Sequence, residues 1–157
     1  MASVSAAPSE RHFKHDKVQK RANTQQDYLN YAATVIGVLN TTYKTSDGLW
    51  GEQWWNSANV LTTLADFIAV DPTSALAKST AASFENTFKL APGYGPSPNF
   101  ENSFNDDTLW WVLAWIRAHD VTGVEAYLTT AALAFDSTTT GWDGTATGWG
   151  KTPCGGL

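Results

Sequence analysis

The fold is decided by the stretch Asn105-Asp106-Asp107-Thr108-Leu109-Trp110-Trp111-Val112-Leu113-Ala114-Trp115, in which two adjacent carboxylates open a long apolar segment. From residue 108 to residue 118 the only charge is Arg117, and neither Gly nor Pro interrupts the segment. The segment lacks the alternation of a strand and is long enough for a helix. Apolar residues fall on every face of that helix. This pattern predicts an inner helix of a multi-helix domain, buried on all sides.

The acidic pair at the start of this helix has two interpretations. The first is structural: Asn105, Asp106 and Asp107 can accept hydrogen bonds from unpaired backbone N–H groups, and the helix dipole favours negative charge there. The second is catalytic, because one Asp is enough for a cap and two crowded carboxylates raise the proton affinity of one of them. Retaining glycoside hydrolysis uses such a pair, with carboxyl groups roughly 5 to 5.5 Å apart. Judged from these residues alone, capping is favoured over catalysis.

Composition narrows the possible functions. With 157 residues the chain has the length of one domain or less, and no apolar run reaches the length of a membrane span. Residues 22–157 contain five basic and thirteen acidic residues, so their net charge of -8 would repel a nucleic-acid backbone. The single cysteine, Cys154, excludes an internal disulfide and a cysteine-based metal cluster. We therefore expect no metal, no cofactor and no nucleic-acid partner.

Tryptophan is unusually abundant, with eight residues, all from Trp50 onward. An indole can stack on the apolar C–H face of a sugar ring while nearby polar groups meet the hydroxyls. Core packing is the simpler explanation and is expected to hold for at least half of the eight. The tryptophans that are not explained by core packing predict a carbohydrate-binding cleft.

The first 21 residues are predicted to lie outside the folded domain. They are basic and show no apolar period, so we expect a disordered arm or the remnant of a propeptide ending at Lys20-Arg21. The apolar segment of a signal peptide is missing from this chain. Asn40-Thr41-Thr42 is a glycosylation sequon, with Asn40 as the acceptor.

Residues 22–157 are predicted to form about five helices and no strand. The expected ranges are 24–43, 54–69, 73–90, the central helix that starts near Asn105, and 124–136, with loops at 91–99 and 138–157. The first, third and fifth helices each have an apolar stripe. These stripes are Tyr28, Ala32, Val35, Leu39 and Tyr43; Leu76, Thr80, Phe84 and Phe88; and Val124, Leu128, Ala131 and Phe135.

The order of these helices predicts a toroid. Two helices that are apolar on most sides begin about fifty residues apart, and each is followed by an amphipathic helix, which is the inner-then-outer pattern of an α/α toroid. Both inner helices begin with a Trp-Trp pair beside Asn or Asp. A sugar site can therefore be assembled from Trp54, Trp55, Asn56, Asn59, Asp106 and Asp107.

The sequence resembles glycoside hydrolase family 76, the endo-acting α-1,6-mannanases, especially the fungal members. The resemblance rests on residues 54–59 (WWNSAN), 105–111 (NDDTLWW), 113–115 (LAW) and 152–157 (TPCGGL). It implies an all-α (α/α)6 barrel of twelve helices, with retaining hydrolysis of mannan or mannooligosaccharide. Asp106 matches the nucleophile and Asp107 the acid/base, while Asn105, Trp110 and Trp111 belong to the same motif as substrate-binding residues. The implied location of the full-length form is secreted or cell wall-associated.

Five predicted helices are fewer than half of twelve, so we expect residues 22–157 to be the N-terminal part of the toroid and to be inactive alone. A non-catalytic carbohydrate-binding or structural helical fragment remains the alternative. An isoprenoid synthase is disfavoured, because Trp110 stands where its Asp-Asp-x-x-Asp pattern needs the last acid. Glu52, Glu101 and Asp143 could approach the cleft, but nothing in the sequence distinguishes them from surface acids.

Overall fold

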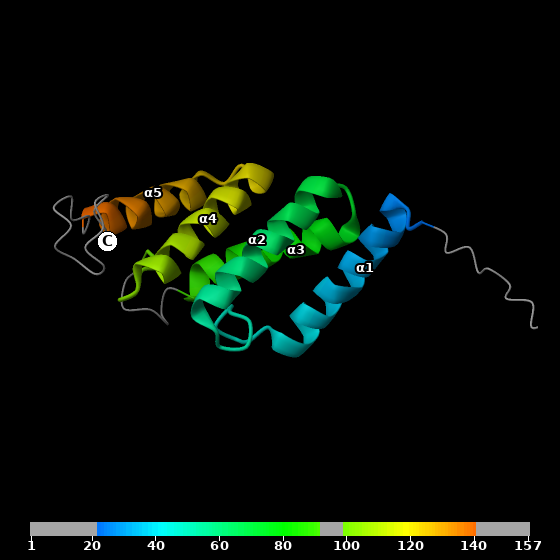
Figure 1. Ribbon diagram of the computed structural model, residues 1–157, viewed down its shortest axis with the longest axis horizontal. Coiled ribbons are helices and arrows are strands. Elements are labelled where there is room, and N and C mark those ends of the chain that lie inside the picture. Colours follow the sequence, from blue (N-terminus) through cyan, green and yellow to red (C-terminus); the bar gives the residue numbers. More distant parts are fainter. Residues whose placement is uncertain (1–21, 92–98, 141–157) are drawn as a thin grey trace, which may run out of the picture.

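The computed structural model describes residues 22–91 and 99–140, and this part of the chain is all-helical (Figure 1). Its α-helices are α1 (Gln25–Val38), α2 (Trp54–Val70), α3 (Ala75–Leu90), α4 (Asn105–Thr122) and α5 (Glu125–Thr140), and a π-helical turn, η1 (Leu39–Tyr43), follows α1. The described residues form isolated bridges at Trp50 but no strand. The all-α prediction is confirmed. The predicted arm at residues 1–21, most of the two predicted loops, and Cys154 lie outside the described residues.

The helix ends follow local sequence signals. Thr24 and Asp27 form a reciprocal capping box at the start of α1, and the hydrogen bonds from Thr24 hold the pKa of Asp27 below its usual value. Ser74 caps α3 by accepting the Ala77 N–H. At the other end of α4, Gly123 adopts a left-handed conformation with φ 70° and donates its N–H to His119 O.

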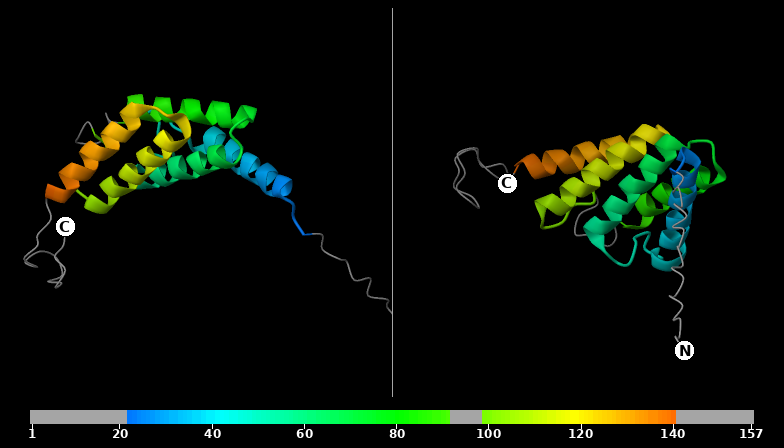
Figure 2. Two further views of the ribbon diagram at one scale, coloured as in Figure 1. Left: turned by 90° about the horizontal axis from the view of Figure 1, so that it is seen from above. Right: turned by 45° about the vertical axis from the view of Figure 1, so that its right-hand side comes forward.

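The helices pack as a layer in which α4 lies between α2 and α5. In Figure 1, α3 lies behind α2. The view from above in Figure 2 shows α3 along one side of the molecule and the first turns of α2 and α4 on the other side. Arg117 of α4 pairs with Asp66 of α2 at 2.5 Å and with Asp120 at 3.1 Å. The hydrogen bond that Arg117 donates to Asp66, and then the one that it donates to Asp120, raise the pKa of Arg117. Two consecutive hairpins, α2–α3 and α4–α5, thus stand side by side.

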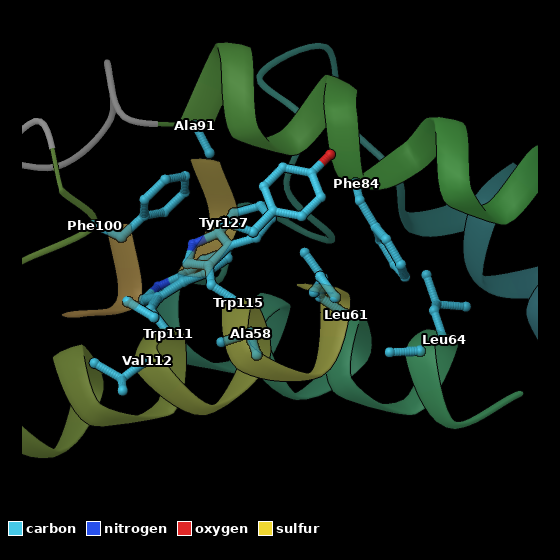
Figure 3. Packing of buried hydrophobic residues seen from close by; sticks show 14 of the residues in the cluster. Ala58, Leu61, Leu64, Phe84, Ala91, Phe100, Trp111, Val112, Trp115 and Tyr127 are labelled. Atoms are coloured by element: carbon cyan, nitrogen blue, oxygen red, sulfur yellow. The ribbon is translucent and has the colours of Figure 1, made fainter. Parts of the chain in front are cut away.

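The core between these helices is strongly aromatic (Figure 3). Rings from α2, α3, α4, α5 and the segment before α4 contact one another with centroids 4.8 to 6.1 Å apart. We call this set the aromatic cluster: Trp54, Phe88, Phe100, Trp111, Trp115 and Tyr127. Burial, and then the charge of Glu85, raise the pKa of Tyr127. Leu61, Leu64 and Phe84 extend the core along α2 and α3.

Three predictions about buried faces are wrong. α4 is not buried on every side, because Trp110 is 41% and Leu113 51% exposed. On α5 the buried residues are Tyr127, Ala131, Ala134 and Thr138, whereas Val124, Leu128 and Phe135 of the predicted stripe are exposed. On α1 only Ile36 is buried, while Tyr28 and Val35 are exposed, as is Tyr43 at the end of η1. The stripe predicted on α3 is confirmed, with Thr80 and Phe84 fully buried.

The exposed apolar residues gather in two grooves at the edges of the layer. The α1–α2 groove, of about 620 Å³, is lined by residues such as Tyr28, Val35 and Val70. The α4–α5 groove, of about 570 Å³, is lined by eight apolar residues, among them Leu113 and Phe135. The helical periodicity was detected correctly, but these faces have no partner among the described residues. Within that part of the chain, no helix has both the length and the apolar content needed to cross a membrane.

Candidate functional site

The two adjacent acids lie in the first turn of α4, in different surroundings. Asp106 is exposed and Asp107 is half-buried. The N-cap residue is Phe104, which makes no side-chain cap, and neither acid accepts a backbone N–H at this helix start among the described residues. The capping interpretation therefore fails in its hydrogen-bonding part, and only the favourable interaction with the helix dipole remains.

Asp107 has a specific partner that the sequence reasoning missed. Asn102 Nδ2 donates to Asp107 Oδ2 at 2.7 Å. The same side chain accepts the Phe104 N–H at its Oδ1 (2.9 Å), and the Asn102 N–H donates to Thr108 Oγ1 at 3.3 Å. The only sequence signal was an Asn three residues before a predicted helix, where such residues often close turns. That signal does not indicate which carboxylate its amide will meet.

Asp106 shares a shallow pocket with an exposed indole. The pocket has a volume of about 230 Å³ and is lined by Asp106, Leu109, Trp110 and Leu113. Asp106 and Trp110 lie four residues apart, so they occupy the same face of α4. An acid beside an exposed aromatic surface is the combination expected for a sugar-binding position.

Trp110 in turn faces Trp55 from α2. Their ring centroids are 6.4 Å apart with an interplanar angle of 30°, and the two side chains are 41% and 43% exposed. The start of α2 and the start of α4 thus contribute one indole each to an open surface, which we call the tryptophan pair. This arrangement is consistent with the sequence prediction that the two helices bring their Trp residues together.

The other two predicted tryptophans point into the core. Trp54 and Trp111 contact each other at 5.0 Å within the aromatic cluster, and Trp111 has no exposed surface. Consecutive helix residues are about 100° apart, so each Trp-Trp dipeptide places one indole outward and one inward. Trp111 can influence a bound glycan only through the neighbours that it supports.

The predicted asparagines lie around the same end of the helices. Asn56 and Asn59 on α2 are half-buried, and Asn59 Nδ2 donates to Trp55 O at 3.2 Å. Asn105 is exposed at the first position of α4. The structure thus brings the predicted polar and aromatic residues to one region, while their contact with a glycan stays a prediction.

The segment before α4 is held in an unusual backbone conformation. Phe100 has φ 64°, a region that bulky residues rarely adopt, yet its side chain is 99% buried in the aromatic cluster. Next to it, Glu101 accepts a hydrogen bond from Ser137 Oγ of α5 at 2.7 Å. Strain of this kind persists where surrounding contacts over-determine the backbone, and it occurs often at functional sites.

A second ordered turn, residues 44–53, precedes α2. The Lys44 ammonium lies 5.3 Å from the Trp50 ring centroid, and burial lowers the pKa of Lys44. The Trp50 indole donates to Asn40 Oδ1 at 3.2 Å. Asn40 is half-buried, and its glycosylation stays a prediction. In the described part of the chain, no group of three His, Cys, Asp or Glu residues is arranged to hold a metal ion.

Comparison with known protein families identifies the family to which the chain belongs. The model of glycosyl hydrolase family 76 matches residues 15–156, which is most of the chain. The chain belongs to glycosyl hydrolase family 76. This membership indicates a glycoside hydrolase acting on a mannan-type glycan, and the hairpins α2–α3 and α4–α5 agree with the six-hairpin fold of family 76. No curated protein and no solved structure matches the chain.

Proposed function

We propose that the chain is the part of a retaining, endo-acting α-1,6-mannanase that carries the two catalytic carboxylates. The observation that supports this best is the position of Asp106 and Asp107, side by side in the first turn of α4 and next to the exposed tryptophan pair. Adjacent carboxylates beside a sugar-stacking surface suit a double-displacement reaction. The substrate linkage follows from the family resemblance described above.

In this proposal Asp106 is the nucleophile and Asp107 the acid/base. Asp107 gives its proton to the glycosidic oxygen while Asp106 attacks the anomeric carbon, so the glycosidic bond breaks and a glycosyl ester forms on Asp106. Asp107 then takes a proton from water, whose oxygen attacks the same carbon and releases Asp106. Exposed Asp106 makes no hydrogen bond to a described residue, which suits a group that must approach a sugar carbon. Asp107 is held by Asn102.

We further propose that the described helices bind mannan more readily than they cleave it. The tryptophan pair and the 230 Å³ pocket are open to solvent, so these residues do not exclude water from a reacting bond. The same observation favours the second candidate function, a non-catalytic carbohydrate-binding module. Both functions use the same aromatic surface, so turnover is what distinguishes them.

The experiment compares the wild-type chain with Asp106→Asn and Asp107→Asn. Indole fluorescence measures the affinity for an α-1,6-mannooligosaccharide, with a maltooligosaccharide as the control ligand. NMR follows the conversion of an aryl α-mannoside to product, and intact-mass spectrometry detects a glycosyl ester on the protein. We expect selective mannooligosaccharide binding in all three proteins. Any product that forms should come from the wild-type chain alone, and the first product should have the retained configuration.

Binding without any product or glycosyl ester would support the binding module. Failure to bind any α-1,6-mannooligosaccharide would contradict both candidate functions. We also propose secretion or cell-wall association, since the substrate would be an extracellular polysaccharide. A glycan mass on Asn40 in protein purified from its native source would support that location.

A further inference from the structure

We propose that Asn102 is a positioning residue, which holds the Asp107 carboxylate in the orientation that its acid/base role requires. The inference rests on the proposed function for the meaning of that role, but the orientation itself can be measured independently. Asn102 does not lie in either Trp-Trp motif. Its side chain joins the segment before α4 to the acid at the third position of α4.

The Asn102 amide cannot rotate without losing both of its hydrogen bonds. Its Oδ1 accepts the Phe104 N–H at 2.9 Å, and its Nδ2 donates to Asp107 Oδ2 at 2.7 Å. A reversed amide would place an NH₂ group against a backbone N–H and a carbonyl oxygen against a carboxylate, and both arrangements are repulsive. The backbone on one side therefore determines that a donor faces Asp107 on the other.

The backbone that carries Asn102 is itself held from three sides. Phe100 is buried in the aromatic cluster at φ 64°, Glu101 is bonded to Ser137 of α5, and the Asn102 N–H donates to Thr108 Oγ1. Thr108 is 2% exposed and also donates to Phe104 O. A donor anchored in this way can fix a carboxylate, whereas a donor on a loose surface loop could not.

The hydrogen bond also distinguishes the two oxygens of Asp107. An amide N–H bonds more strongly to a carbonyl-type oxygen than to a hydroxyl oxygen, so Asn102 favours Oδ2 as the unprotonated oxygen of the acid form. The transferable proton then resides on Oδ1. Positioning of this kind affects the rate of proton transfer more than the binding of the glycan.

A purely structural role makes a different prediction for one isosteric variant. In Asn102→Asp, the side-chain oxygen can still accept the Phe104 N–H, so the turn at the start of α4 is preserved. The donor to Asp107 is lost, and a like charge takes its place. Asn102→Ala loses both contacts. Asn30→Asp is the matched control, because Asn30 is an exposed residue on α1 whose side-chain Oδ1 accepts a hydrogen bond from Gln26 of the same helix.

The test measures the χ1 rotamer of Asp107 by three-bond NMR couplings in the isotopically labelled full chain, together with thermal unfolding. We expect one rotamer in wild type and Asn30→Asp. We expect rotamer averaging in Asn102→Asp, with a melting temperature close to that of the control. A single, unchanged Asp107 rotamer in Asn102→Asp overturns the proposal. Unfolding of Asn102→Asp to the same degree as Asn102→Ala also overturns it, and assigns Asn102 to helix initiation.

Kinetics on an aryl α-mannoside add a second readout. If the wild-type chain hydrolyses this substrate, we expect kcat in Asn102→Asp to fall at least about tenfold while KM changes less than about twofold. An unchanged kcat contradicts the proposal. If wild type fails to bind mannooligosaccharide but the rotamer result holds, the proposed function is wrong and the orientation of Asp107 by Asn102 stands.

Discussion

At the scale of single residues, the site depends on which way each indole points. Trp55 and Trp110 are exposed and face each other, while Trp111 lies behind them without exposed surface. The indole N–H groups of Trp111 and Trp115 have no hydrogen-bond acceptor among the described residues. Burial of apolar rings is therefore the main contribution of these two residues, and direct stacking on a glycan is proposed for the tryptophan pair alone.

The first prediction contrasts these two classes. Trp55→Ala and Trp110→Ala should each weaken mannooligosaccharide binding about 3- to 10-fold, since an aromatic contact contributes about 0.5 to 1.5 kcal/mol. Both variants should keep nearly the wild-type unfolding curve. Trp111→Ala should instead lower the free energy of unfolding by about 3 to 5 kcal/mol. Fluorescence titration and urea unfolding provide the two measurements.

An equal loss of stability in all three variants would contradict this division. It would mean that the tryptophan pair is structural despite its exposure.

At the scale of elements, the turn at residues 44–53 is joined to α3 by a close backbone approach. Gly48 has φ 81°, and its missing Cβ would lie 3.0 Å from Thr87 Cα and 3.2 Å from Asn86 O. Thr87 Oγ1 donates to Gly48 O at 2.7 Å in the buried contact. Only glycine satisfies both the positive φ and the close approach. The turn before α2 and the outer helix α3 therefore form one unit.

The second prediction compares Gly48, where an added Cβ would meet the backbone of α3, with Gly37, where it would meet nothing. Gly48→Ala should destabilise the protein by about 1 to 3 kcal/mol, because it adds backbone strain and a clash with α3. Gly37→Ala, in α1 with nothing within 4 Å of an added methyl group, should stabilise it by about 0.5 to 1 kcal/mol. Urea unfolding of both variants checks the opposite signs. A neutral Gly48→Ala would show that the turn is free to move away from α3.

The helices were predictable from the sequence because each has local start and stop signals, such as Thr24, Asp71-Pro72 and Gly123. The predicted end of α5 at residue 136 falls four residues short, since nothing but Ser and Thr follows before residue 141. The buried face of α5 was mispredicted for a different reason. Periodicity identifies every apolar stripe but does not say which one is buried. α5 carries two stripes: the one that contains Tyr127 is buried, and the predicted one, which contains Leu128, is mostly exposed.

The site was predictable only in its chemistry-bearing residues. Asp106, Trp55 and Trp110 belong to recognisable motifs, and the fold brings their helices together. Asn102 was not predictable, because its role depends on the bend at Ser103 before α4, which lets its amide reach an acid five residues later. The strained Phe100 was hidden for the same reason: a positive φ at an aromatic residue has no sequence signature.

At the scale of the whole molecule, the helical layer has an apolar groove at each edge. A contiguous exposed apolar surface promotes association and binding of hydrophobic dyes. Leu113 lies in the α4–α5 groove and is 51% exposed. Leu133 on α5 is equally exposed, at 50%, but does not line the groove. The two leucines therefore separate the effect of the groove from the effect of exposure.

The third prediction compares Leu113 with Leu133. Leu113→Lys should reduce dye fluorescence and concentration-dependent association of the purified chain, whereas Leu133→Lys should change both much less. Neither should shift the free energy of unfolding by more than about 0.5 kcal/mol. Dye titration and sedimentation at several protein concentrations measure the effect. Equal responses from the two variants would exclude the groove as the associating surface.

The aromatic cluster has an optical consequence as well as a structural one. The Trp111 ring lies 5.0 Å from the Trp54 ring and 5.9 Å from the Trp115 ring, measured between centroids. These distances are short enough for the electronic transitions of the three indoles to couple. Coupled indoles split their far-ultraviolet absorption and add a couplet to the circular dichroism beside the helix bands. Excitation also migrates among them, which depolarises their emission. The couplet should disappear when the rings separate, so core loosening and helix melting can be followed as two signals in one spectrum.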